Sequence, residues 1–211
     1  TSGNTTAATT TTGSSSDGGG PSDGGGTAEG GGGSSGDGGG ASTDPIDAPP
    51  EEWTWVDFPT SRCIDDSPTG IGVNVSASND EDVVIFLQGG NACFNTVTCF
   101  VTAHTDGFGE AEIDDEIAQV GALDLFTRGD QNPIGDWSWA YVPYCTGDVH
   151  TGNDAGVEVG GETRTFRGFR NMSEYLGRLV ATFPNAKRVL LTGVSAGGFG
   201  VQGFNAPASV T

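Results

Sequence analysis

The sequence has few positively charged residues, and this scarcity limits the partners that the protein can have. Of its 211 residues, eight are Lys or Arg and 28 are Asp or Glu, which gives a formal net charge of −20 at pH 7. Residues 1–50 carry six of the acids and no base, and residues 51–211 carry the other 22 acids and all eight bases. Because nucleic acids and anionic membranes bind basic surfaces, this charge argues against both as partners.

Large apolar side chains are also scarce, above all in residues 1–50. This part has no aromatic residue and almost no large apolar one except Ile46, so it cannot bury enough surface to offset the entropy lost on ordering. We therefore expect residues 1–50 to be a disordered acidic linker, rich in Gly, Ser and Thr. Its DGGG repeats lack the alternation of calcium-binding nonapeptide repeats, so we expect no metal site in it.

Long apolar runs are absent, and this affects where the protein can reside. No stretch of about 18 apolar residues occurs, so the sequence predicts no transmembrane segment. Residue 1 is Thr and not Met, which suggests a leader that was removed or lies outside this numbering. A Gly/Ser/Thr/Asp spacer before a compact domain is typical of exported proteins, so we expect a periplasmic, cell-surface or extracellular protein, with a lipid or wall tether through the linker left open.

Only four cysteines and two histidines are present, which argues against a metal centre. The cysteines are Cys63, Cys93, Cys99 and Cys145. Cys93 and Cys99 are six positions apart and His104 is the only imidazole near them, a spacing that does not fit a zinc site. An even number of cysteines favours two disulfides in one of three possible pairings, and hence an oxidising compartment. We predict no cofactor.

Residues 51–211 show the pattern of a compact α/β domain. Short apolar runs at 83–87, 139–142 and 189–191 predict strands covered on both faces. Apolar residues spaced three and four apart predict a helix over 169–183, ended by Pro184, and a weaker helical pattern covers 113–126. Strands that alternate with helices predict a mostly parallel sheet with helices on both faces.

The segment GVSAG at 193–197 fits the pattern G-x-S-x-G, in which a serine nucleophile occupies a sharp strand-to-helix turn. In a glycine-rich chain the pattern alone is weak, and a merely structural corner is the alternative. The context supports the nucleophile, because VLLT forms a predicted strand before Ser195 and a possible helix follows it. We therefore expect Ser195 to be a catalytic nucleophile.

A tetrahedral intermediate on Ser195 requires hydrogen-bond donors for its oxyanion. In this arrangement one N–H comes from the residue after the serine, here Ala196, and another from a glycine-rich loop after an earlier strand. The segment QGGNA at 88–92 follows the predicted strand 83–87, so we expect Gly90 and Asn91 to supply donors; an ordinary turn is the alternative.

A general base for Ser195 is harder to find in this sequence. Both histidines, His104 and His150, precede Ser195, whereas this fold orders its triad as Ser, then Asp or Glu, then His. Asp148 and His150 suggest a triad, but a loop or surface role is the better interpretation of either histidine. We expect the acid and the base beyond residue 211, so that the chain holds the N-terminal part of a catalytic domain.

Several separated sequence blocks resemble one known family. They are WTW (53–55), CIDDSPTG (63–70), FLQGGNACFNTVTC (86–99), DWSWAYVPYCTGDVHTG (136–152), FRGFRN (166–171) and LTGVSAGGFG (191–200). In consistent order from about residue 53 to 208, they resemble the pectin acetylesterase family of serine carboxylesterases, which includes Notum-like enzymes and exported bacterial members. The order of the blocks is much more specific than G-x-S-x-G alone.

The resemblance implies an α/β-hydrolase-like fold and a serine carboxylesterase that removes acetyl or another acyl group from a polysaccharide such as pectin, or from another small ester. It implies Ser195 as nucleophile, Gly90, Asn91 and Ala196 as the oxyanion hole, and the triad Asp and His beyond residue 211. It also implies disulfides Cys63–Cys145 and Cys93–Cys99. One departure is Asn91, where bacterial relatives usually have Gly.

A second hypothesis is a non-catalytic cell-surface protein that keeps the esterase scaffold to bind carbohydrate. Exposed tryptophans at positions 53, 55 or 137 would stack on sugars in that case, although tryptophans in such blocks are more often part of a core.

Overall fold

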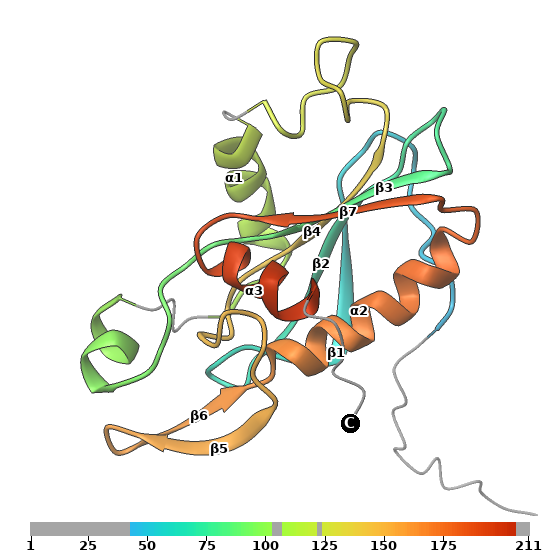
Figure 1. Cartoon of the computed structure of the whole chain (residues 1–211). Helices are drawn as coiled ribbons and strands as arrows, with labels where there is room; N and C mark the ends of the chain where they lie inside the picture. The colour runs from blue at the N-terminus through green and yellow to red at the C-terminus, as the bar shows by residue number, and fades with distance from the viewer. Residues whose placement is uncertain (1–42, 103–106, 122–123, 206–211) are drawn as a thin grey trace, which may run out of the picture. The chain divides into compact units, whose positions relative to one another are not determined.

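The computed structural model describes residues 43–102, 107–121 and 124–205 (Figure 1). Its main sheet contains β1 (Thr54–Arg62), β2 (Pro68–Asn74), β3 (Asp82–Leu87), β4 (Ser138–Val142) and β7 (Arg188–Gly193). A separate hairpin contains β5 (Asp154–Val159) and β6 (Glu162–Phe166). The helices are the π-helix η1 (Thr98–Thr102), α1 (Glu110–Gly121), α2 (Gly168–Thr182) and α3 (Ala196–Asn205).

The main sheet is mixed, with strand order β1-β2-β4-β3-β7. The three predicted strands, β3, β4 and β7, form its parallel part, with β3 between the other two. β1 and β2 are antiparallel and extend the sheet beyond β4. The short connection between β1 and β2 suits antiparallel pairing, whereas the parallel strands are joined through helix-containing segments. The sequence pattern did not predict β1, β2 or the β5–β6 hairpin.

Strand β3 shows why the centre of the sheet is buried on both faces. Its residues alternate between two hydrophobic clusters, with Val83, Ile85 and Leu87 in one and Val84 and Phe86 in the other. This alternation follows from the two-residue period of a strand. The prediction of a strand covered on both faces is therefore confirmed for β3 and β4. It is wrong for β7, whose Val189 and Leu190 are 59 % and 39 % exposed, because β7 is the end strand of the described sheet and pairs there only with β3.

Helices cover both faces of the sheet (Figure 1). The buried side of α2 contributes Met172, Tyr175 and Leu179 to the first cluster, and α1 contributes Ile113 to the second. The predicted helix over 169–183 is observed at Gly168–Thr182, and the weaker pattern over 113–126 corresponds to the shorter α1. The structure thus confirms an α/β-hydrolase-like arrangement with helices on both faces.

Ile46 packs into the compact part of the chain. Its side chain is 7 % exposed and belongs to the cluster under α2, and its backbone N–H donates to Thr182 Oγ1 at 2.8 Å. Ile46 therefore packs against the domain, although the sequence predicted that the linker continues to residue 50. Residues 1–42 lie outside the described residues, and the linker stays a prediction.

Two disulfides fix loops at one end of the sheet, and both pairings implied by the resemblance are confirmed. Cys63–Cys145 joins the end of β1 to the loop after β4, with a Cα–Cα distance of 4.9 Å. Cys93–Cys99 closes the loop after β3, with a Cα–Cα distance of 4.3 Å. Within the described ranges, no helix is long and apolar enough to cross a membrane, and no cluster of His, Cys, Asp or Glu could hold a metal ion.

Candidate active site

Ser195 lies in the turn between β7 and α3 and is exposed to solvent. Its φ of +54° places it in the left-handed region, which residues with a side chain seldom adopt. The turn is tight, because a Cβ atom at Gly193 would lie 2.7 Å from the backbone of Gly197, and one at Gly197 would lie 2.0 Å from the carbonyl oxygen of Leu87. The glycines of G-x-S-x-G thus let α3 fold back against the ends of β7 and β3.

Ala196 begins α3 directly after Ser195 and is buried. The first N–H groups of a helix have no partner within the helix, and the helix dipole adds partial positive charge at that end. The next turn is already closed, because the N–H of Gly197 donates to Val194 and that of Phe199 donates to Ser195. The start of α3 therefore places the backbone N–H of Ala196 beside Ser195.

Residues 88–93, which we term the β3 exit loop, lie against the Ser195 turn. β3 and β7 are neighbouring parallel strands, with Leu87 opposite Gly193, so their carboxyl ends lie together. A Cβ atom at Gly89 would lie 3.0 Å from Ser195 Cβ and 2.5 Å from the Val194 carbonyl oxygen. The absence of a side chain at Gly89 permits this approach, which brings the predicted donor loop to the predicted nucleophile.

The β3 exit loop is held from the other side by the segment that follows β4. The Gln88 N–H donates to the Val142 carbonyl at 2.9 Å, and the Tyr144 N–H donates to Gln88 Oε1 at 2.7 Å. The Tyr144 ring occupies the space where a side chain at Gly90 would lie, at 2.2 Å from a Cβ atom there. Gly90 is half-buried and Asn91 is exposed, so the two predicted donors lie where the loop reaches solvent.

His150 is buried, with 2 % of its surface exposed. Its Nε2 lies 2.9 Å from the Gln88 carbonyl oxygen, and since a carbonyl only accepts, the hydrogen is on Nε2. Burial lowers the pKa of His150, which favours the neutral imidazole. These contacts occupy His150 within the loop packing and do not make it available as a base for Ser195.

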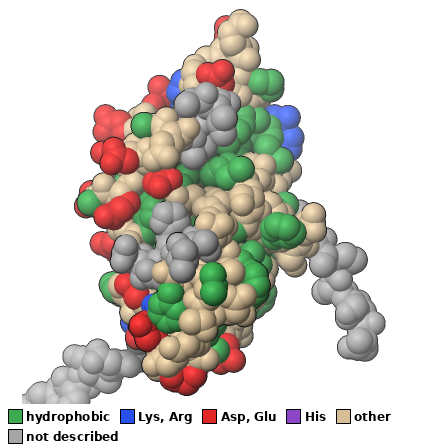
Figure 2. Space-filling model, turned by 90° about the vertical axis from the view of Figure 1, so that its left-hand side faces the viewer, with side chains coloured by type: hydrophobic (Ala, Val, Ile, Leu, Met, Phe, Trp, Pro, Cys, Tyr) green, Lys and Arg blue, Asp and Glu red, His purple; other side chains and the backbone are tan. Residues whose placement is uncertain are grey.

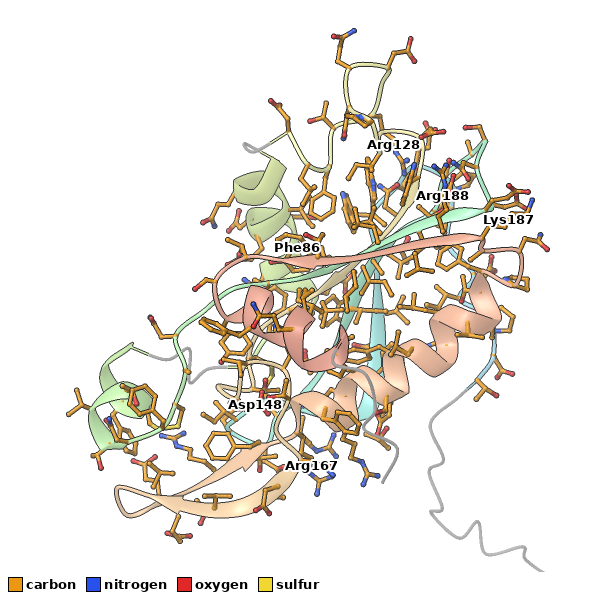
Figure 3. The ribbon with its side chains drawn as sticks, in the orientation of Figure 1. Phe86, Arg128, Asp148, Arg167, Lys187 and Arg188 are labelled. Atoms are coloured by element: carbon orange, nitrogen blue, oxygen red, sulfur yellow. A yellow bond between two sulfur atoms is a disulfide. The ribbon has the colours of Figure 1, made fainter. Side chains whose placement is uncertain are left out.

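Asp148 makes structural hydrogen bonds in the same segment. Its Oδ1 accepts from the Thr146 hydroxyl at 2.5 Å, and its Oδ2 accepts from the Gly168 N–H at 2.7 Å. Figure 3 shows Asp148, a residue of the β4–β5 loop, near the start of α2. The side chains of Asp148 and His150 are therefore both engaged in other hydrogen bonds, and they do not form a triad with Ser195. His104 lies outside the described residues.

The face around Ser195 is apolar and acidic. Phe94 and Phe199 are 75 % and 65 % exposed, and Val194 beside the serine is also exposed. Figure 2 views the side where the β3 exit loop and the Ser195 turn lie, and it shows apolar side chains in the middle with Asp and Glu mainly along the left margin and at the bottom. Lys187 and Arg188 lie at the opposite end of β7, paired with Glu81 and Asp82 (Figure 3).

The tryptophans suggested for sugar stacking pack against the protein. Trp53 contacts the rings of Phe126 and Trp139, with centroids 5.2 and 6.2 Å away. Trp55 packs on Phe108, and Trp137 lies under the Arg188 guanidinium. All three tryptophans are half-buried and pack against the second hydrophobic cluster, which favours a core role.

Gln88 and Tyr144 were not predicted from the sequence to be functionally important. Both lie within the quoted blocks, FLQGGNACFNTVTC and DWSWAYVPYCTGDVHTG, and this was the only signal in the sequence that could have drawn attention to them. The structure brings these two blocks and the block LTGVSAGGFG together around the Ser195 turn.

Comparisons with known proteins identify the family of the chain. The family described as Pectinacetylesterase matches residues 53–204. Palmitoleoyl-protein carboxylesterase NOTUM of Schmidtea mediterranea is 32 % identical over 152 residues, covering 68 % of this chain and 28 % of that protein. Pectin acetylesterase 4 of Arabidopsis thaliana is 30 % identical over 140 residues, covering 64 % of this chain and 34 % of that protein. The chain thus spans about a third or less of these relatives.

Proposed function

The chain belongs to the pectinacetylesterase family, and from this premise and the Ser195 turn we propose that the protein is a serine carboxylesterase. In the proposed reaction, Ser195 Oγ attacks the carbonyl carbon of an ester while a base accepts its proton. The tetrahedral intermediate expels the alcohol, which takes up a proton, and leaves an acyl group on Ser195. Water then releases the acid and restores the serine.

One observation carries this proposal: Ser195 has a φ of +54° at an exposed turn directly beside Gly89. Strained backbone at an exposed polar residue is typical of functional sites, because the surrounding contacts must maintain it. We assign the oxyanion hole to the backbone N–H groups of Gly90, Asn91 and Ala196. The side chain at Asn91 does not alter the backbone donor, but it changes the shape of the site beside the acyl group.

We assign the triad acid and base to residues beyond 211, as the resemblance implies. The contacts of His150 and Asp148 support this assignment, since both side chains are engaged in the packing of the β4–β5 loop. Ser195 and its oxyanion donors would then belong to the first part of the catalytic domain, and the proton-transfer groups to the second.

For the substrate, we propose an acylated polysaccharide such as pectin, with acetyl or another acyl group removed. The printed names of the relatives indicate that the acyl group varies, because one is a pectin acetylesterase and another a palmitoleoyl-protein carboxylesterase. The exposed apolar side chains of Phe94, Val194 and Phe199 offer contact area to an acyl group. The two disulfides support an exported protein, and we propose that residues 1–50 tether it to a wall or lipid.

The proposal is tested by labelling the full-length protein with a fluorophosphonate probe and by measuring hydrolysis of an aryl acetate. We expect the label on Ser195, and Ser195→Ala should lower kcat/KM by at least about 1,000-fold, because without the nucleophile only binding and oxyanion stabilisation remain. A correctly folded protein that neither takes up the label nor turns over the ester would show that the site is not a serine esterase.

A further inference from the structure

We propose that His150 is a positioning residue, which fixes the β3 exit loop beside Ser195 by donating its Nε2–H to the Gln88 carbonyl. This inference rests on the proposed function, since it assigns His150 a role in orienting the oxyanion donors. In this role His150 does not contact the substrate or take part in the reaction. It acts by holding the loop that carries the proposed donors.

Three hydrogen bonds hold Gln88 in place. Its backbone N–H, its side-chain Oε1 and its carbonyl oxygen bind Val142, Tyr144 and His150 respectively, at 2.9, 2.7 and 2.9 Å. All three partners come from one segment, residues 142–150, which a disulfide at Cys145 ties to Cys63. Of the three partners, only His150 binds Gln88 through its side chain, so a substitution at position 150 removes this contact and leaves the other two in place.

The hydrogen bond to His150 also sets the orientation of the peptide plane between Gln88 and Gly89. In a trans peptide the N–H points opposite to the carbonyl, so a carbonyl that faces His150 directs the Gly89 N–H away from His150. Rotation of this plane would turn the following residues, Gly90 and Asn91, which are the proposed donors. The tolerance is small, because oxyanion donors must lie about 2.7–3.1 Å from the developing charge.

The surrounding residues hold His150 in a strained position. Val149 and His150 have φ values of +53° and +64°, a conformation that is exceptional for a β-branched residue such as valine. The Val149 N–H donates to the Tyr144 hydroxyl at 2.9 Å, and the Tyr144 ring packs on the imidazole with centroids 4.9 Å apart. Gly200 of α3 leaves room for the ring, since a Cβ atom there would lie 3.1 Å from His150 Cβ.

These contacts place one histidine between helix α3 and the β3 exit loop. The His150 ring lies between α3, which begins beside Ser195, and the Gln88 carbonyl, from which the β3 exit loop begins. If His150 only filled space in the core, the volume of its ring would be sufficient. The proposed role also requires the hydrogen-bond donor at Nε2. The two roles are therefore separable by substitution.

The test compares His150→Leu with His150→Gln in the full-length protein. Leucine keeps much of the volume and removes the donor, whereas the glutamine amide nitrogen can reach the position of Nε2. We expect His150→Leu to lower kcat for an aryl acetate by about 10- to 100-fold with KM changed less than about threefold, since small misplacements of catalytic groups have effects of this size. His150→Gln should recover most of the lost kcat.

The outcomes separate this inference from the proposed function. If wild-type protein is not labelled at Ser195, the proposed function fails. If wild-type protein is active and both variants match it, or if both lose kcat equally while their melting temperatures stay native, the donor role of His150 is refuted. Should His150→Leu fail to fold, side-chain ¹⁵N NMR of the wild type decides the point: a slowly exchanging proton on Nε2 is expected, and a proton on Nδ1 with bare Nε2 would overturn the proposal.

Discussion

Ser195 adopts a left-handed backbone conformation, and the glycines around it make this conformation accessible. Gly193 and Gly197 permit the close contact of α3 with the strand ends, while Gly89 permits the approach of a second segment. None of these three glycines is explained by its own φ. Each one is explained by another part of the backbone that lies where a Cβ atom would be.

At Gly89, we expect Gly89→Ala to lower esterase kcat by at least about 10-fold, because a misplaced donor loop loses oxyanion stabilisation. The added methyl group would meet the Val194 carbonyl at 2.5 Å and Ser195 Cβ at 3.0 Å, so either the loop or the serine must shift. Steady-state kinetics on an aryl acetate measures the effect.

The matched control is Gly177→Ala on α2, where a Cβ atom would meet nothing within 4 Å. That change should leave kcat as in the wild type and stabilise the helix by roughly 0.5–1 kcal/mol. Equal kinetics for the two alanine variants would contradict the packing of the β3 exit loop against the Ser195 turn.

At the scale of elements, the two disulfides restrain very different lengths of chain. Cys63–Cys145 spans 82 residues and joins β1 to the loop after β4, whereas Cys93–Cys99 spans six residues within the β3 exit loop and its continuation to η1. Closing a long loop removes more entropy from the unfolded chain than closing a short one. The first disulfide therefore acts on the whole fold, and the second on one loop.

We expect the Cys63→Ala/Cys145→Ala variant to lose about 4.5 kcal/mol of unfolding free energy, and Cys93→Ala/Cys99→Ala about 2 kcal/mol, from loop-closure entropy. Urea denaturation of each variant under oxidising conditions measures both values. A larger loss for the shorter bridge would show that native contacts in the β3 exit loop, and not chain entropy, determine the stabilisation.

For the molecule as a whole, the main feature is the incomplete burial of β7. Among the described strands, β7 pairs only with β3, and its Val189 and Leu190 are 59 % and 39 % exposed. Val180 on α2 is 71 % exposed near the same edge. An unpaired apolar strand edge favours association with another strand.

We predict that the 211-residue chain by itself hydrolyses p-nitrophenyl acetate no faster than its Ser195→Ala variant, because with the triad acid and base assigned beyond residue 211 the proposed oxyanion donors would act without a base. We also expect this chain to melt at low temperature over a broad range, since the β7 edge is uncovered. A clear difference in rate between the two proteins would place a base within residues 1–211. A sharp cooperative melt would contradict the expected instability.

The sequence by itself determined the elements with strong local patterns. The apolar run at 83–87 and the apolar spacing over 169–183 define β3 and α2, and GVSAG defines the turn at Ser195, because each pattern lies within one element. β1 and β2 were not predicted, since their burial depends on partners: Pro59 and an irregular register near Phe58 and Arg62 interrupt the alternation in β1.

Only the tertiary structure decided how the site residues are related. Gln88, Tyr144, His150 and Ser195 are separated by up to 107 positions, and no local pattern records that a histidine imidazole contacts a glutamine carbonyl. Parallel pairing of β3 with β4 and β7 brings their carboxyl ends to one edge, and the loops that leave this edge then pack together. Local sequence fixes the conformation of each segment, whereas contacts between distant segments form only when the sheet has assembled.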